Sequence, residues 1–263
     1  MHYLISGLAK SGTTRLFSQL QEAILSGACA PQTAFEPDTD EALNGILAHE
    51  GDTLTKVLIG RVNADNAPIA RFDRHLLIYR DPRDQFLSTL LYFFYDFQIR
   101  DLPDAFARAY AALERKVADP EGVATIDLYC EVAELADRAP LGVFERLHAI
   151  QNTFAATFRP HPVRYEALVD GENLQELEAY LGLVLHNEDV TVPETYARVA
   201  RSKGYGEWRR WFNREDLAFA DRHWGTHLEA LGYARVTEPG ELSISTASSL
   251  DYVRQFDPRA LAV

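Results

Sequence analysis

The sequence predicts an α/β protein with a central parallel sheet and helices on both of its faces. Short apolar stretches typical of buried strands alternate with segments whose apolar residues recur at helical spacing. Alternation of this kind is typical of parallel sheets that helices cover on both sides. We expect one domain over residues 1–263, in which the Ser/Thr-rich part from about 236 onward is a surface extension.

The same two patterns place the elements in chain order. The segments expected to be strands are 3–6, 53–60 and 75–80, with a short strand and a turn at 161–168. The segments expected to be helices are 13–26, 84–97, 102–117, 141–158, 173–183, 193–200 and 214–231. Aromatic residues crowd the stretch 90–97, which indicates either the wall of an acceptor pocket or part of the core.

Composition excludes several classes of protein. The 263-residue chain is 47% apolar and 25% charged, which is ordinary for a globular protein. No apolar run reaches the ~20 residues of a membrane helix and no basic stretch precedes the first strand, so we expect a cytoplasmic protein. Cys29 and Cys130 are then expected to be free thiols. The net charge of −13 argues against general nucleic-acid binding, so a polyanionic ligand requires basic residues gathered at one site.

The stretch YLISGLAKSGTTRL, residues 3–16, has the pattern of a phosphate-binding loop. A strand ends, the backbone turns, and the amide groups at the start of a helix point at one anion. Gly7 and Gly12 allow the backbone to approach a ligand closely. The hydroxyl donors of this loop are expected to be Ser11, Thr13 and Thr14.

The lysine of this loop is displaced. In nucleotide triphosphatases the pattern is Gly-x4-Gly-Lys-Ser/Thr, with lysine directly after the second glycine. Here Thr13 occupies that position and the lysine is Lys10, three residues earlier. The loop is therefore expected to bring its positive charge to a different part of the ligand.

The segment AKSGTT at 9–14 resembles the 5′-phosphosulfate loop of the sulfotransferases that use 3′-phosphoadenylyl sulfate (PAPS), usually Pro-Lys-Ser-Gly-Thr-Thr followed by Trp or Leu. Ala9 replaces the proline and Arg15 the usual tryptophan, which in cytosolic members helps to stack the adenine. The resemblance implies that PAPS is held here by residues of the loop, namely Lys10, Ser11, Gly12, Thr13 and Thr14.

A second match lies in YRDPRDQFLS, which is similar to the family's Arg-Asn/Asp-Pro-Arg/Lys-Asp with a serine eight residues after the arginine. Arg80 ends a predicted strand and Ser88 falls in the first turns of the next helix. Asp81 and Pro82 suit a helix start as cap and first residue. Arginine can donate two parallel hydrogen bonds to a phosphate. The resemblance assigns Arg80 and Ser88 to the 3′-phosphate.

A third match, VRYEAL, is similar to the family's Tyr-Glu-Asp-Leu after a strand, where the tyrosine lies near the adenine. The corresponding residue is Tyr165, and the alternative is a tyrosine packed at a strand end.

A fourth match, RSKGYGEWRRWF at 201–212, resembles the loop Arg-Lys-Gly-x-x-Gly-x-Trp-Lys/Arg that closes over the 3′-phosphate, with one residue fewer between the glycines. Arg201 and Lys203 are both candidates for the phosphate contact, and Gly204 fits the close approach of such a loop.

Together these matches imply a P-loop-type three-layer sandwich with the nucleotide at the carboxyl ends of the strands. The implied reaction is in-line transfer of a sulfonate group from PAPS to a hydroxyl or amine of an unknown, small-molecule acceptor, releasing adenosine 3′,5′-bisphosphate. Lys10 would neutralise the leaving oxygen. No cluster with metal-ligand spacing is evident, so no metal is expected.

The sequence offers more than one candidate for the general base. Many cytosolic members carry Lys-Thr-His at the end of a strand, and here Lys56 matches the lysine while Leu58 stands in place of the histidine. Some relatives, among them the protein-tyrosine sulfotransferases, instead use a glutamate, and Glu36 lies at a similar point. Glu36 is our candidate for the base. The alternatives are that Glu36 is a solvated loop carboxylate, or that the base is His75, His49 or another acidic residue.

Two other functions remain open on sequence alone. A P-loop NTPase or small-molecule kinase would use the same loop, but Thr13 in the lysine position and the absence of an evident metal-binding aspartate argue against it. A PAPS-binding module without catalysis is favoured by the missing histidine, whereas Lys10 argues for turnover.

Overall fold

The computed structural model describes residues 1–25, 30–62, 67–138, 141–185 and 204–261. The chain divides into two compact units. The first, here called the sheet unit, comprises Met1–Arg80 and Leu147–Ala200, and the second, here called the helical unit, comprises Asp81–Arg146 and Arg201–Val263. Among the described helices, none is both long and apolar enough to cross a membrane.

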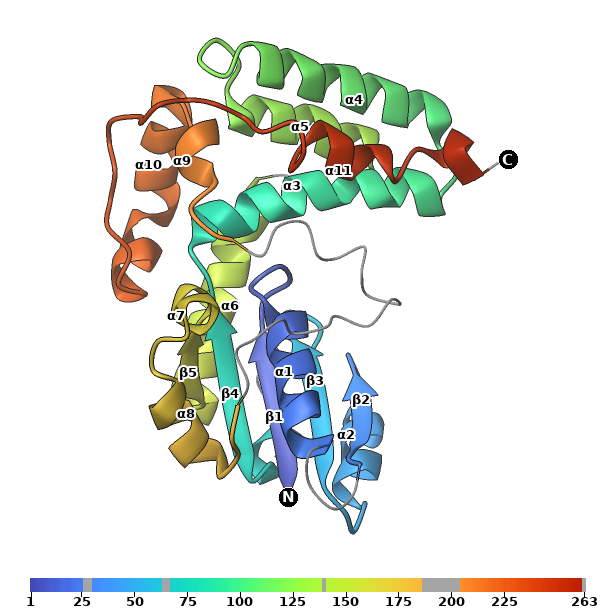
Figure 1. The fold of residues 1–263 in the computed structure, drawn as a ribbon, viewed down its shortest axis with the longest axis vertical. Helices are drawn as coiled ribbons and strands as arrows, with labels where there is room; N and C mark the ends of the chain where they lie inside the picture. Colours follow the sequence, from blue (N-terminus) through green and yellow to red (C-terminus); the bar gives the residue numbers. More distant parts are fainter. Residues whose placement is uncertain (26–29, 63–66, 139–140, 186–203, 262–263) are drawn as a thin grey trace. The chain divides into compact units, whose positions relative to one another are not determined.

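The sheet unit contains a five-stranded sheet in the order β2-β3-β1-β4-β5 (Figure 1), with every neighbouring pair parallel. The strands are β1 (His2–Gly7), β2 (Gln32–Phe35), β3 (Thr53–Leu58), β4 (Arg74–Tyr79) and β5 (His161–Arg164). The predicted parallel α/β fold is confirmed. The sequence analysis did not predict β2, which is a four-residue edge strand without a buried residue and so lacks the apolar signal of the inner strands.

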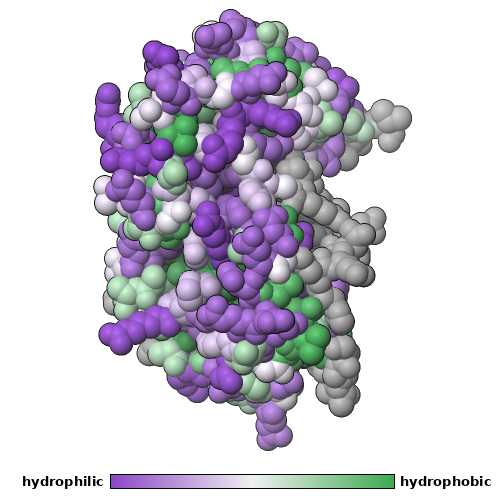
Figure 2. Space-filling model, turned by 60° about the vertical axis from the view of Figure 1, so that its left-hand side comes forward, coloured by the Kyte–Doolittle hydropathy of each residue, from purple (hydrophilic) through white to green (hydrophobic). Residues whose placement is uncertain are grey.

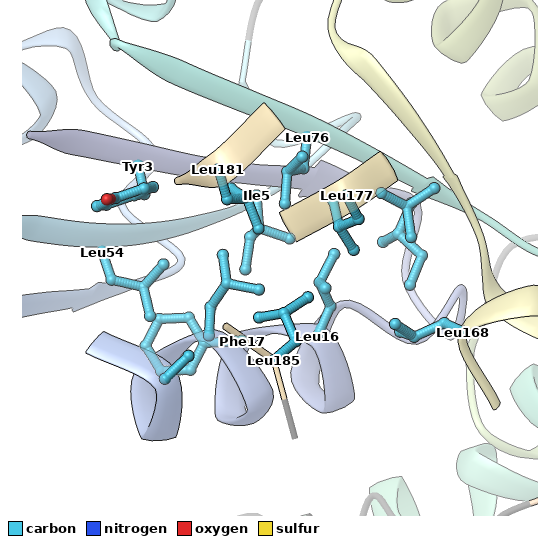
Figure 3. Packing of buried hydrophobic residues seen from close by; sticks show 14 of the residues in the cluster. Tyr3, Ile5, Leu16, Phe17, Leu54, Leu76, Leu168, Leu177, Leu181 and Leu185 are labelled. Atoms are coloured by element: carbon cyan, nitrogen blue, oxygen red, sulfur yellow. The ribbon is translucent and has the colours of Figure 1, made fainter. Parts of the chain in front are cut away.

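Alternating side chains of the strands build two apolar layers. Tyr3 and Ile5 of β1 contribute to one cluster and Leu4 to the other, because neighbouring residues of a strand point to opposite faces. Figure 3 shows the first cluster, in which Leu16 and Phe17 of a helix pack with strand residues. The helices that contribute to this cluster are α1 (Thr13–Leu25), α7 (Tyr165–Asp170) and α8 (Leu174–Leu181). The opposite cluster includes residues of α2 (Asp40–Leu47), η1 (Ala67–Arg71) and α6 (Val143–Phe158).

The helical unit is built around α3 and an aromatic core. Phe86 of α3 stacks on Tyr129 and contacts the rings of Phe144 and Trp224, with ring centroids 4.9–5.3 Å apart. The helices of this unit are α3 (Pro82–Ile99), α4 (Pro103–Ala118), α5 (Thr125–Leu135), α9 (Trp208–Trp211), α10 (Arg214–Ala230), α11 (Leu250–Arg254) and η3 (Pro258–Leu261).

The aromatic stretch 90–97 belongs largely to this core. Phe94 and Phe97 are fully buried and pack edge-to-face on each other and on Phe106 of α4. Of the two interpretations of this stretch, the structure supports the core for Phe94 and Phe97, because both rings are fully buried against other aromatic rings.

Several segments differ from the sequence-based expectation. The turn expected within 161–168 is the helix α7, and α2 and α5 had no counterpart among the predicted elements. The segment from about 236 is not only a surface extension, because it carries α11, which packs on α3 and α4, with Val253 and Phe256 buried. The helix expected at 193–200 lies outside the described residues.

Figure 2 shows that hydrophilic side chains dominate one face of the molecule, with hydrophobic residues scattered between them. Large hydrophobic side chains exposed in the described part of the chain are isolated residues such as Leu25, Ile99 and Val184. Exposed hydrophobic residues of this kind are normal on the surface of a globular protein.

Candidate active site

The loop between β1 and α1 is wound tightly on itself. A Cβ atom added to Gly7 would lie 2.7 Å from Ser11 Oγ and 2.8 Å from the carbonyl oxygen of Ile78, so only glycine fits. Ser11 N and Ser11 Oγ both donate to the carbonyl oxygen of Leu8, at 3.2 and 2.7 Å. The Ser11 hydroxyl thus closes the loop, and Thr13 begins the helix at whose amino end an anion can bind.

Lys10 and Glu36, the two residues that sequence analysis assigned to catalysis, share an unusual backbone conformation. Their φ angles are 66° and 58°, in the left-handed region that costs a residue with a side chain about 1 kcal/mol or more. Each comes after a strand of the sheet, Lys10 after β1 and Glu36 directly after β2. Such conformations occur at functional sites and also at turns, and the other described non-glycine residues that share this one are Asp101, Asp137, Arg159 and Asn173.

Glu36 is held by two cations. Lys56 Nζ donates to Glu36 Oε1 at 2.7 Å, and Arg61 Nη1 donates to Oε2 at 2.8 Å. The side chain of Lys56 is only 3% exposed, whereas that of Glu36 is 21% and that of Arg61 61% exposed. The carboxylate therefore has one deeply buried partner and one partner at the surface.

Lys56 connects Glu36 to the loop. Its Nζ atom also donates to Thr14 Oγ1 at 3.3 Å and lies 3.8 Å from the centroid of the Phe35 ring. Burial lowers the pKa of Lys56, and the hydrogen bond and charge of Glu36 partly offset this effect. The sequence analysis matched Lys56 to a family lysine without giving it a role, although a lysine inside an otherwise uncharged buried strand is a signal in itself.

Arg80, the predicted 3′-phosphate ligand, lies next to Tyr165. Arg80 directly follows β4 and Tyr165 directly follows β5, and the Arg80 Cζ atom is 4.6 Å from the centroid of the tyrosine ring. The same ring lies against Gly12, where an added Cβ atom would approach Tyr165 Cδ2 to 2.3 Å. Within the sheet unit the structure thus brings together one residue from each of the first three sequence motifs, namely Gly12, Arg80 and Tyr165.

Two of the remaining predicted site residues, Ser88 and Gly204, lie in described parts of the helical unit. Ser88 is half-buried in α3, and Gly204 is exposed in a segment without regular structure. Arg201 and Lys203 lie outside the described residues.

Within the helical unit the second and fourth motifs meet through Asp84. Its carboxylate accepts hydrogen bonds from the backbone N–H groups of Gly206 and Trp208. Arg83 stacks on the Trp208 ring, with 3.7 Å between Cζ and the ring centroid. Asp81 caps α3 by accepting from Arg83 N, which confirms the helix start predicted at Asp81 and Pro82.

The two histidines considered as alternative bases are placed differently. His75 is buried near the amino end of β4, with its Nε2 atom 2.9 Å from Ser6 Oγ, and burial lowers its pKa to about 4. His49 is exposed just after α2. The position of His75 favours a structural role. Glu36 stays the candidate for the base, because Lys56 connects it to the loop at Thr14.

The described parts of the chain contain one of the two cysteines. Cys130 is an exposed, free thiol on α5, and Cys29 lies outside the described residues. The described residues contain no group of three or more His, Cys, Asp or Glu side chains that could hold a metal ion.

Comparisons with known proteins identify the fold. No protein-family model matches the chain, and no curated protein is significantly similar to it in sequence. The structure is similar to the crystal structure of mouse sulfotransferase SULT7A1 complexed with PAP, with a TM-score of 0.52 at 13% sequence identity. The similarity covers 87% of this chain and 84% of the mouse chain. The protein therefore has the sulfotransferase fold that its motifs predict.

Proposed function

We propose that this protein is a sulfotransferase that moves a sulfonate group from PAPS to a hydroxyl or amine of a small-molecule acceptor. The observation that carries the proposal is the loop after β1. In this loop Thr13 stands where a triphosphatase has its lysine, and the lysine is Lys10, whose backbone is in the left-handed conformation. The sulfotransferase fold and the PAP complex of the mouse protein support the same assignment.

The charges of the site suit an anionic nucleotide. In a chain of net charge −13, the carboxyl ends of neighbouring strands carry Lys10 after β1, Lys56 in β3 and Arg80 after β4. We assign the 5′-phosphate side of the donor to the loop amide groups with Thr13 and Thr14, and the 3′-phosphate to Arg80. The motif resemblance alone adds Ser88, Gly204 and either Arg201 or Lys203 as candidates for contacts with the same nucleotide.

The donor supplies an activated sulfonate, whose bond to the bisphosphate oxygen breaks as the acceptor oxygen or nitrogen bonds to sulfur. Lys10 would balance the negative charge that develops on the leaving oxygen. The loop amide groups at the start of α1 would act in the same direction, because the positive end of the helix dipole faces that charge.

Glu36 is the proposed acceptor of the proton. Lys56 and Arg61 each donate a hydrogen bond to one oxygen of this carboxylate, so the two cations fix its position beside the loop. Arg61 is 61% exposed, and ion pairs with an exposed partner contribute little, so an acceptor group can displace Arg61 from one carboxylate oxygen at small cost. Lys56 would continue to hold the other oxygen.

The proposal is tested by titrating the purified protein calorimetrically with adenosine 3′,5′-bisphosphate and, separately, with ATP plus Mg²⁺. We expect the bisphosphate to bind without metal and ATP to bind far more weakly. A preference for ATP with Mg²⁺ would overturn the proposal in favour of a kinase or NTPase. Binding of the bisphosphate without sulfonate transfer to any member of an acceptor screen with PAPS would favour a binding module.

A further inference from the structure

The parallel register of β4 and β5 explains why Arg80 and Tyr165 meet. The Cα partner of Tyr79 is Arg164, and the next residues along the two strands are Arg80 and Tyr165. Both strands end there, so the two side chains leave the sheet at the same edge. The guanidinium group lies 4.6 Å from the ring centroid, within the range of a cation–π contact.

The tyrosine ring also touches the phosphate loop. An added Cβ atom on Gly12 would lie 2.3 Å from Cδ2 and 2.8 Å from Cε2 of Tyr165, which is closer than a Cβ atom comes to atoms it is not bonded to. Gly12 has a φ of 99°, a conformation that itself favours glycine. The ring of Tyr165 is thus in contact with the loop backbone as well as with Arg80.

Burial indicates what this ring does. Tyr165 is 5% and Arg80 7% exposed, so the ring offers little free surface on which a base could stack. A flat and rigid aromatic group held between a loop and an arginine fixes the spacing between them, because close-packed interiors tolerate little displacement.

We propose that Tyr165 is a positioning residue whose ring sets the spacing between the loop at Gly12 and the guanidinium of Arg80, and thereby couples the two phosphate-binding groups. The inference rests on the proposed function, since it takes the loop and Arg80 to bind the two phosphates of one nucleotide. Its consequence is selectivity: the site favours an adenosine that carries phosphates at both the 3′ and 5′ positions over either monophosphate.

The experiment measures dissociation constants calorimetrically for adenosine 3′,5′-bisphosphate, adenosine 5′-monophosphate and adenosine 3′-monophosphate. Tyr165→Leu removes the ring, and we expect the preference for the bisphosphate over each monophosphate to fall about tenfold, which lies between the effects of an exposed and a desolvated cation–π contact. Tyr165→Phe retains the ring without the hydroxyl, and we expect its preference to stay within about twofold of the original. Tyr165→Met, which keeps volume without a flat ring, is measured beside Leu as a second ring-free variant.

A matched control is available at the other end of β4. Arg74, the first residue of that strand, lies 5.5 Å from the ring centroid of Tyr180, another arginine–tyrosine pair in the same unit. Tyr180→Leu removes this ring at the opposite edge of the sheet, and we expect it to affect the melting temperature without changing the ratio of dissociation constants.

The outcomes separate the inference from the proposed function. If the unsubstituted protein shows no preference for the bisphosphate over the monophosphates, the proposed function fails first. If it shows the preference and the ring-free variants retain it, Tyr165 does not position the site and the inference is wrong. A loss in Tyr165→Phe equal to that in Tyr165→Leu would also overturn it, because the hydroxyl and not the ring would then be responsible.

Discussion

Lys56 and Glu36 are joined by two hydrogen bonds of opposite direction. Glu36 N donates to the carbonyl oxygen of Lys56 at 2.7 Å, and Lys56 Nζ donates to Glu36 Oε1 at 2.7 Å. The first bond continues the ladder between β2 and β3, and the second ties the proposed base to a buried cation. Because β3 lies between β2 and β1, Lys56 spans from Glu36 to Thr14 of the phosphate loop.

Substitution of Lys10 separates turnover from binding. Lys10→Ala removes the charge proposed to face the leaving oxygen, so we expect kcat to fall roughly 10²–10³-fold with a smaller effect on bisphosphate affinity. Arg80→Ala is the matched comparison, because its proposed ligand is the 3′-phosphate, which does not react. We expect Arg80→Ala to raise the Kd for the bisphosphate more than it lowers kcat. Steady-state kinetics with PAPS and calorimetry decide, and equal effects of both variants on Kd would contradict the assignment of Lys10.

Substitution of Glu36 tests the base. Glu36→Gln keeps an oxygen for the hydrogen bond from Lys56 but cannot take up a proton at neutral pH, so we expect kcat to fall roughly 10²–10⁴-fold. The bisphosphate affinity should change little. Arg61→Gln is the control, because it removes the exposed cation from the same carboxylate and leaves the proposed base in place. A Glu36→Gln variant that turns over at the original rate would exclude Glu36 as the base.

Asp84 is expected to stabilise the Gly206–Trp208 segment. Asp84→Ala leaves the N–H groups of Gly206 and Trp208 without their carboxylate acceptor, so we expect the free energy of unfolding to fall by about 1–3 kcal/mol. Hydrogen exchange at these two amides should become faster. Asp104→Ala on the exposed first turn of α4 serves as control, with a change within about 0.5 kcal/mol. Unchanged exchange at both amides in Asp84→Ala would show that the carboxylate does not hold this segment.

His75 makes stability depend on pH in the acid range. Burial lowers its pKa from 6.5 to about 4, so between these values the unfolded chain binds a proton that the folded protein does not. Stability therefore falls as the pH decreases from 6.5 to 4, with a slope of up to about 1.4 kcal/mol per pH unit from this group. Urea unfolding of His75→Gln between these pH values should give a shallower slope than the unsubstituted protein. The exposed His49 provides the control, and a His49→Gln variant that alone flattened the slope would refute this account.

Much of the fold could be predicted because its signals are local. The loop from Gly7 to Thr14 is a contiguous stretch in which a strand, two glycines and a helix start follow one another, and the helix start at Asp81 and Pro82 is equally local. The edge strand β2 escaped prediction because its four residues carry no buried apolar pattern. The aromatic residues of α3 could not be divided between pocket and core, because the sequence does not show which faces of a helix its neighbours cover.

The sequence by itself determined the parallel α/β fold, the phosphate loop with its displaced lysine and the motif that begins at Arg80. These depend on periodicity and on residues close together in the chain. Only the tertiary structure decided that Lys56 joins Glu36 to Thr14 and that the Tyr165 ring lies against both Gly12 and Arg80. Such contacts follow from the order and register of parallel strands, which bring together residues up to 153 positions apart, Gly12 and Tyr165 (165 − 12), and which no local pattern specifies.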